Sequence, residues 1–154
     1  MKIVWNMKIM NQKDQDKFKK IVSIILLISW CLIIYYFSNQ NGNLSTTSSS
    51  HLIDFINKLL RINLYDFEYS VLIVRKLAHM FLYFILFVLS YNCFLNFKIN
   101  KKYLYAIIFC LLYSISDEVH QLFIIERTAN IIDIVIDMLG SFMGLSFCKL
   151  FKFN

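Results

Sequence analysis

Four long apolar runs divide this chain, and they restrict it to folds in which lipid replaces water around much of the surface. The runs cover residues 21–37, 71–95, 103–125 and 131–151. At about 1.5 Å per residue the first run is roughly 26 Å long as a helix, which nearly crosses a bilayer core. A composition of 58% hydrophobic and 17% charged residues fits lipid better than water as the solvent. The sequence therefore predicts an all-α, polytopic protein with a bundle of four transmembrane helices.

The runs form one predicted membrane domain, residues 21–151, between a basic tail at residues 1–20 and a short tail at residues 152–154. Residues 38–70 form the predicted outer loop, which contains a serine-rich stretch at residues 45–50. From His51 to Asn63, polar residues recur at helical spacing opposite an apolar face. This pattern predicts a short amphipathic helix that lies on the membrane, and a loop that packs on the helix ends is the alternative.

The cations mark the ends of the apolar runs. Eleven lysines lie in the N-terminal tail, in the connection at residues 96–102 and at the C-terminus, which all fall on one side of the membrane. The positive-inside rule therefore predicts cytoplasmic N- and C-termini. Because these cations do not form a patch interleaved with polar surface, the net charge of +6 does not indicate a nucleic-acid partner. The four cysteines lie in four separate runs and indicate neither a disulfide framework nor a zinc knuckle.

Ionisable residues occur at similar heights in three of the runs. Measured from the lysines at the cytoplasmic ends, Asp117, Asp137 and His79 lie roughly 22, 18 and 28 Å up their helices. We therefore expect one polar cluster near the outer surface, with the helix at residues 21–37 mainly a packing or lipid-facing element. The residues expected to converge are Arg75, Lys76, His79, Asp117, Glu118, His120, Gln121, Arg127, Asp133 and Asp137.

Small residues accompany the carboxylates on the last run. Asp133, Asp137, Gly140, Ser141 and Gly144 fall on one helical stripe, since residues three or four apart share a face. Glycine and serine on such a stripe let a neighbouring backbone approach closely. We therefore expect the face that bears the carboxylates to be a packing face directed into the bundle.

Three interpretations of the polar cluster remain open. The first is a salt-bridge network that clamps the helices together. The second is a divalent metal site built from His79, His120, Asp117 and Glu118, with a carboxylate acting as base toward a bound water. The third is a metal-free pocket that opens outward.

In the third interpretation, cations bind an anionic amphiphile headgroup and nearby groups do acid-base work. Arg75, Lys76 and Arg127 would hold the headgroup, since arginine forks suit phosphates. The acid-base candidates are Asp117, Glu118, His120 and His79. Gln121, Asp133 and Asp137 complete the predicted binding set. Membrane lipids are the expected partners in this interpretation.

The order and spacing of these residues resemble the VanZ-like family of bacterial membrane proteins. The resemblance lies in the motifs Arg75-Lys76-Leu77-Ala78-His79 and Ser116-Asp117-Glu118-Val119-His120-Gln121, followed by Arg127 and then Asp133, Asp137 and Gly140. Two positions depart from the usual pattern. Leu82 stands where a glutamate is often found, and Ile124-Ile125-Glu126 replaces the more usual proline-glycine link before Arg127.

The resemblance implies a multi-pass protein of the bacterial plasma membrane, linked to the cell envelope and to reduced susceptibility to teicoplanin. It implies a glycopeptide or a lipid-linked cell-wall precursor as a partner, but it supplies no reaction. Two other classes of function therefore stay open. One is an intramembrane hydrolase or transferase that acts on a lipid-linked substrate, with or without metal, and the other is a structural or partner-binding membrane subunit.

Overall fold

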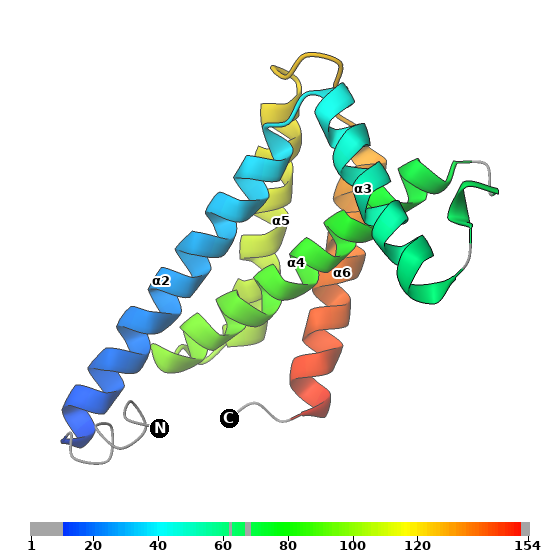
Figure 1. Cartoon of the computed structure of the whole chain (residues 1–154). Helices are drawn as coiled ribbons and strands as arrows, with labels where there is room; N and C mark the ends of the chain where they lie inside the picture. Colours follow the sequence, from blue (N-terminus) through cyan, green and yellow to red (C-terminus); the bar gives the residue numbers. More distant parts are fainter. Residues whose placement is uncertain (1–10, 62, 67–68, 152–154) are drawn as a thin grey trace.

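The computed structural model describes residues 11–61, 63–66 and 69–151 of the chain. They form five α-helices and one short 3-10 helix, and no strand occurs within these ranges, so the all-α prediction is confirmed. The elements in chain order are α2 (Gln12–Ser38), α3 (Gly42–Leu60), η1 (Leu64–Asp66), α4 (Ser70–Asn96), α5 (Lys102–Gln121) and α6 (Ile131–Leu150) (Figure 1).

Helices α4 and α6 pack side by side and run in the same direction. Near their N-terminal ends the Lys76 ammonium lies 2.7 Å from a carboxylate oxygen of Asp133. Two turns further along α4, the Phe84 ring stacks edge-on against Phe147, with ring centroids 5.6 Å apart. Because the contacts advance together along both helices, α4 and α6 are parallel neighbours.

Helices α2 and α5 run the opposite way to α4. From α2, the Trp30 indole donates a hydrogen bond of 2.9 Å to the Leu82 carbonyl, and Lys20 lies over the Phe97 ring at 5.3 Å. On the α5 side, Tyr103 near the start of the helix stacks on Tyr91 near the end of α4, at 4.6 Å between centroids. The start of α2, the connection from α4 to α5 and the end of α6 thus lie at one end of the bundle (Figure 1).

Glycine allows the close approach of α6 to α4. A Cβ on Gly140 would overlap the Met80 carbonyl oxygen, and a Cβ on Gly144 would lie 2.9 Å from the Phe84 carbonyl oxygen. Asp137 and Ser141 on the same stripe are fully buried. The prediction that the small-residue stripe is a packing face is therefore confirmed, and the aspartate is carried into the interior with it.

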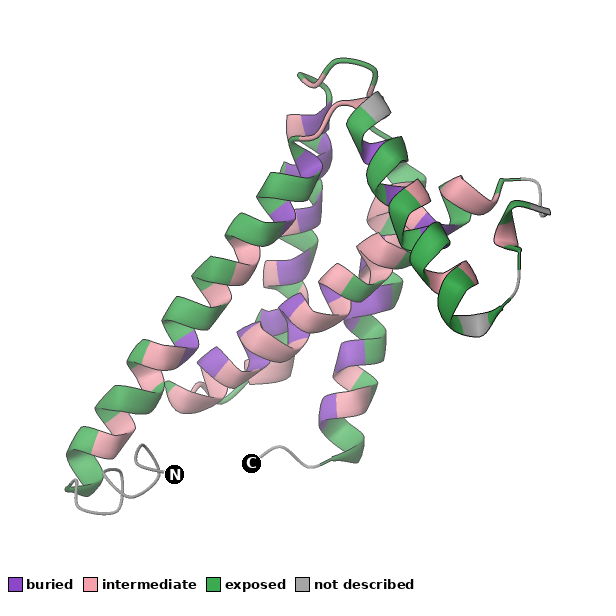
Figure 2. Cartoon of the chain, viewed as in Figure 1, coloured by how far each residue is buried: buried purple, intermediate pink, exposed green. Residues whose placement is uncertain are grey.

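Much of the outer surface of the bundle is apolar. Buried residues concentrate where the helices meet, and the outward faces are exposed (Figure 2). Ile25, Ile28 and Leu32 of α2 are each more than half exposed. Three helices, α2, α4 and α6, are long and apolar enough to cross a membrane. Helix α5 is not among them, so the predicted count of four transmembrane helices is not confirmed.

Two predicted helix boundaries were wrong. The first helix begins at Gln12 rather than at residue 21, since residues 12–20 are mostly good helix formers and contain no breaker. Helix α5 ends at Gln121 rather than at residue 125. Beyond Gln121 the backbone turns, with Phe123 donating to the His120 carbonyl, and the Ile125 carbonyl accepts a hydrogen bond from the Gly42 backbone N–H at 3.3 Å. This contact holds the segment as a link against the start of α3.

The helix in the predicted outer loop is longer than expected. It starts at Gly42, so the serine-rich stretch belongs to it, and its position on a membrane stays a prediction. The Asn41 side chain caps it by accepting from the Leu44 N–H at 2.8 Å. Hydroxyls such as those of Thr46 and Ser49 donate to backbone carbonyls four residues earlier, so their hydrogen bonds are made within the helix.

Substitution of Gly140 by alanine tests the contact between α4 and α6. A Cβ at this position meets a backbone oxygen, which no side-chain rotation can relieve, so we expect a loss of about 1–3 kcal/mol in the free energy of unfolding. Thermal unfolding of the purified protein in detergent measures this loss. The adjacent Leu139→Ala, at a position half exposed on the outer face, should change stability less. An equal effect of the two substitutions would contradict the role of the glycine.

Candidate functional site

The polar residues selected from the sequence gather at the end of the bundle where α2 and α5 end and α4 and α6 begin. Those buried in the structure are Asp117, Glu118, Gln121 and Asp137, and those that are partly exposed are Arg75, Lys76, His79, His120, Arg127 and Asp133. None of them points wholly away from the bundle. They fall into a closed group of hydrogen-bonded side chains and an open cavity beside it.

Asp137 is the centre of the closed group. One of its carboxylate oxygens accepts a hydrogen bond of 2.7 Å from the Ser114 hydroxyl of α5. The other lies 3.7 Å from Nδ1 of His79 on α4, within ion-pair distance but too far for a hydrogen bond. A carboxylate of α6 thereby connects α4, α5 and α6 in the interior.

Gln121 joins α5 to α2. Its amide nitrogen donates to the Ser38 hydroxyl at 3.1 Å and to a carboxylate oxygen of Asp117 at 3.2 Å. All three side chains are buried. The first helix therefore contributes to the cluster, although the sequence predicts mainly a packing or lipid-facing role for it.

Two further contacts fix the link between α5 and α6. The Glu118 carboxylate accepts a hydrogen bond of 2.8 Å from the Asn130 backbone N–H, and the Asn130 side chain caps α6 by accepting from the Ile132 N–H at 3.0 Å. The ion pair of Lys76 with Asp133 lies next to this cap. Arg127 is thus carried on a short link whose two ends are tied to the bundle.

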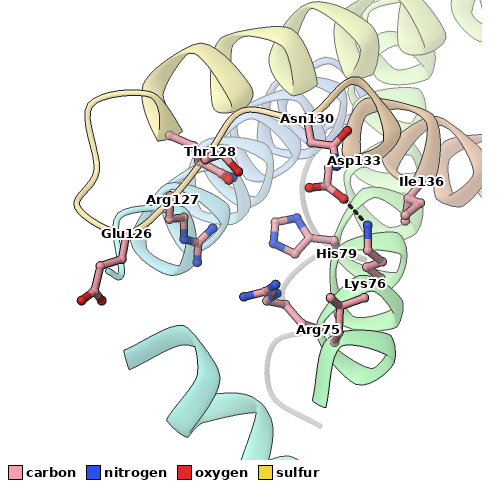
Figure 3. A pocket seen from close by; sticks show the side chains of 11 residues that line it. Arg75, Lys76, His79, Glu126, Arg127, Thr128, Asn130, Asp133 and Ile136 are labelled. Atoms are coloured by element: carbon pink, nitrogen blue, oxygen red, sulfur yellow. Dashed lines mark hydrogen bonds and ion pairs between the residues drawn. The ribbon is translucent and has the colours of Figure 1, made fainter. Parts of the chain in front are cut away.

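The open part of the site is a cavity of about 260 Å³ between this link and the first turns of α4 and α6. In Figure 3 the guanidinium groups of Arg75 and Arg127 and the ring of His79 point toward the same space, whereas Glu126 points away from it. Within the described ranges neither arginine side chain forms an ion pair, and Nε of Arg127 is buried without a hydrogen-bond partner. The cavity therefore presents two guanidinium groups that form no ion pair.

The electrostatic surroundings of Arg127 agree with this geometry. Burial lowers the pKa of its guanidinium, the nearby charge of Arg75 lowers it further, and Asp117, Glu118 and Asp133 oppose both effects. Arginine still stays protonated in proteins. An anion between the two guanidinium groups would offset the repulsion from Arg75, which adds to the larger effect of burial on this pKa.

His120 has different neighbours from His79. Its Nε2 lies 3.2 Å from the Asn39 side-chain oxygen, and its ring packs 5.0 Å from that of Tyr35, both at the end of α2. Across residues 11–61, 63–66 and 69–151, no group of three or more His, Cys, Asp or Glu side chains is placed to hold a metal ion. The arrangement therefore gives no support to a divalent metal shared by the candidate ligands His79, His120, Asp117 and Glu118.

Three residues of the site were not among those selected from the sequence. Ser38 accepts a hydrogen bond from Gln121, and Ser114 donates one to Asp137. The Asn130 backbone N–H donates to Glu118. Ser114 lies one turn before Asp117, and helical spacing already places it in the same sector as Asp117, Glu118 and Gln121. Ser38 and Asn130 lie at helix ends, where spacing along the sequence does not reveal a contact with another helix.

The fold and the site define a helical membrane protein with a cationic cavity at one end of its bundle. A model of the VanZ/LLP1 family matches residues 23–152. The chain belongs to this family, as the resemblance had predicted. Comparisons with curated proteins and with solved structures gave no match.

The closed group should contribute more to stability than the ion pair beside it. Asp137→Ala leaves the buried Ser114 hydroxyl without an acceptor, and we expect a loss of about 1–3 kcal/mol in the free energy of unfolding. Asp133→Ala breaks a pair whose side chains are 28% and 30% exposed. We expect a loss of only about 0.2–1 kcal/mol there. Thermal unfolding in detergent compares the two, and a larger loss for Asp133→Ala would contradict this division of the cluster.

Proposed function

We propose that this protein crosses the bacterial plasma membrane four times, with both termini in the cytoplasm and the cationic cavity facing outward. The parallel arrangement of α4 and α6 supports this topology. If both helices span the membrane in the same direction, the chain must return between them, and α5 is the segment that connects them. At 20 residues α5 is about 30 Å long, which matches the hydrocarbon core. Its last turns carry Asp117, Glu118 and His120, which lowers its hydropathy.

The lysines support the orientation. Lys98, Lys101 and Lys102 lie at the end of the bundle that also holds the start of α2 and the end of α6, and the positive-inside rule assigns that end to the cytoplasm. Thr128, which lines the cavity, lies at the opposite end.

Cysteine labelling in intact cells tests the orientation. Thr128→Cys places a thiol on the exposed link, and we expect a membrane-impermeant maleimide to label it from outside. Lys101→Cys should be labelled only after the cells are opened. The native cysteines, all within α2, α4, α5 and α6, set the background, which the unsubstituted protein measures. The reverse labelling pattern would overturn the proposed topology.

We further propose that the protein lowers susceptibility to teicoplanin by binding an anionic headgroup in this cavity. The observation that carries this proposal is the pair of guanidinium groups, Arg75 and Arg127, which face one cavity without an anionic partner. Forked guanidinium donors suit phosphate and carboxylate groups, which lipid headgroups, lipid-linked cell-wall precursors and glycopeptides present. Membership of the VanZ/LLP1 family supports the link with the cell envelope.

A second function, hydrolysis or group transfer on a lipid-linked substrate, has one observation in its favour. Nδ1 of His79 and one oxygen of Asp137 are buried, lack hydrogen bonds and lie 3.7 Å apart, and His79 lines the cavity. A histidine oriented by a carboxylate is a common general base. Turnover of a lipid-linked phosphate by the purified protein, abolished by His79→Gln, would favour this function over binding alone.

The resistance proposal is tested in a sensitive Gram-positive host. We expect the intact protein to raise the inhibitory concentration of teicoplanin and the double substitution Arg75→Gln with Arg127→Gln to remove most of that rise. Asp117→Ala with His120→Ala alters the neighbouring side chains and should also reduce it. Membrane abundance is measured for each variant, because a drop in abundance would explain the loss as misfolding.

A charge substitution outside the cavity provides the control. Lys58→Gln removes an exposed cation of α3 that does not line the cationic cavity, and it should leave the effect unchanged. An intact protein without effect on teicoplanin would refute the resistance proposal. A full effect in the double arginine variant at normal abundance would refute the role of the cavity. Normal abundance with lost effect would exclude a purely structural role for these residues.

A further inference from the structure

A second, larger cavity lies between α3, α4 and the end of α2. Its volume is about 530 Å³, within the range of about 300–1,000 Å³ typical of small-molecule sites. Its walls are mostly hydrocarbon, and we call it the apolar groove. Phe37, Leu52, Ile56, Leu77, Phe81 and Leu82 form much of its surface. Leu77 and Phe81 are more than half exposed, so the groove is continuous with the apolar outer surface of the bundle.

The apolar groove adjoins the cationic cavity. Three residues, Arg75, His79 and Arg127, line both spaces. The two unpaired guanidinium groups therefore stand at the border between a polar space and an apolar one. A ligand that extends across this border must have an anionic end and a hydrocarbon end.

The sequence of α3 keeps the groove open and apolar. Ser45, Ser49 and Ile53 form the buried stripe of α3, and the small serines leave space where larger residues would fill it. The Ser49 hydroxyl donates to the Ser45 carbonyl at 2.9 Å within the helix. Its hydrogen bond is thus made internally, and the wall does not require water or a polar ligand.

We propose that the cavity and the groove together form one binding site for an anionic lipid, with its phosphate between Arg75 and Arg127 and one hydrocarbon chain in the apolar groove. This inference rests on the proposed binding of an anionic headgroup and adds the class of ligand and the place of its chain. Charge complementarity selects an anionic lipid over a zwitterionic one. The apolar lining selects a lipid over a water-soluble phosphate.

Native mass spectrometry of the full chain in detergent tests the proposal with three probes. These are dioleoyl phosphatidylglycerol, dioleoyl phosphatidylcholine with the same chains, and glycerol 3-phosphate without chains. We expect phosphatidylglycerol to bind at least about tenfold more tightly than phosphatidylcholine, and glycerol 3-phosphate to give no adduct where phosphatidylglycerol saturates. Equal binding of the two lipids would show only non-selective surface lipid and would overturn the proposal. Binding of glycerol 3-phosphate as tight as that of phosphatidylglycerol would refute the chain site.

Substitutions that fill the groove test the place of the chain. Ala78→Trp projects an indole into the groove from α4, and we expect it to weaken binding of phosphatidylglycerol about tenfold. Leu52→Trp does the same from α3 and serves if Ala78→Trp lowers folded yield. Ile73→Trp, on α4 but outside both cavities, is the matched control and should bind normally. Normal binding in both groove variants would overturn the proposal.

The lipid-binding readout separates this inference from the resistance proposal. Selective binding of phosphatidylglycerol that the groove variants weaken supports the lipid site even if teicoplanin susceptibility does not change. The opposite result is that lipid binding is unselective, while the teicoplanin effect needs Arg75 and Arg127 but survives Ala78→Trp and Leu52→Trp. That result refutes the lipid site and leaves the resistance proposal standing.

Discussion

The close parallel contact of α4 with α6 is the constraint on which the rest of the structure depends. Gly140 and Gly144 bring the α6 backbone against the carbonyl groups of α4. This approach aligns Asp133 with Lys76 and Asp137 with His79. Because the two helices are parallel, the chain between them has to return along the bundle. Helix α5 makes that return and carries Ser114 to Asp137.

The clamp interpretation and the proposed pocket concern different residues of the polar cluster. Ser38, Ser114, Asp117, Gln121 and Asp137 are buried and connected by hydrogen bonds, which is what a clamp between helices requires. Arg75 and Arg127 take no part in these bonds and line the cavity. A buried polar group is tolerated when its bonds are made inside the protein. An unpaired arginine beside a cavity is satisfied by water or by a ligand, so the functional interpretation belongs to the open part of the cluster.

The sequence predicted what depends on periodicity and composition. The apolar runs gave the four long helices, and spacing of three and four along α6 gave the buried stripe with Asp137 and Gly140. It did not predict contacts made at helix ends. His120 shares a sector with Asp117 in the sequence pattern, yet it packs on Tyr35, and Gln121 finds Ser38 only because α2 ends beside α5. The start of α2 and the end of α5 also escaped the pattern, since helix propensity and backbone contacts set them rather than hydrophobicity.

The link before α6 shows how the cavity can persist although the usual proline-glycine pair is absent. Glu126 adopts φ 62°, a left-handed conformation that glycine would favour. Its carbonyl oxygen would lie only 2.6 Å from a Cβ on Gly42. The link can therefore approach the start of α3 this closely only because Gly42 has no side chain. The Gly42 N–H bonds the Ile125 carbonyl from the same side. The position of Arg127, the next residue, thus depends on α3. Because α3 also forms a wall of the apolar groove, this one helix supports both parts of the proposed lipid site.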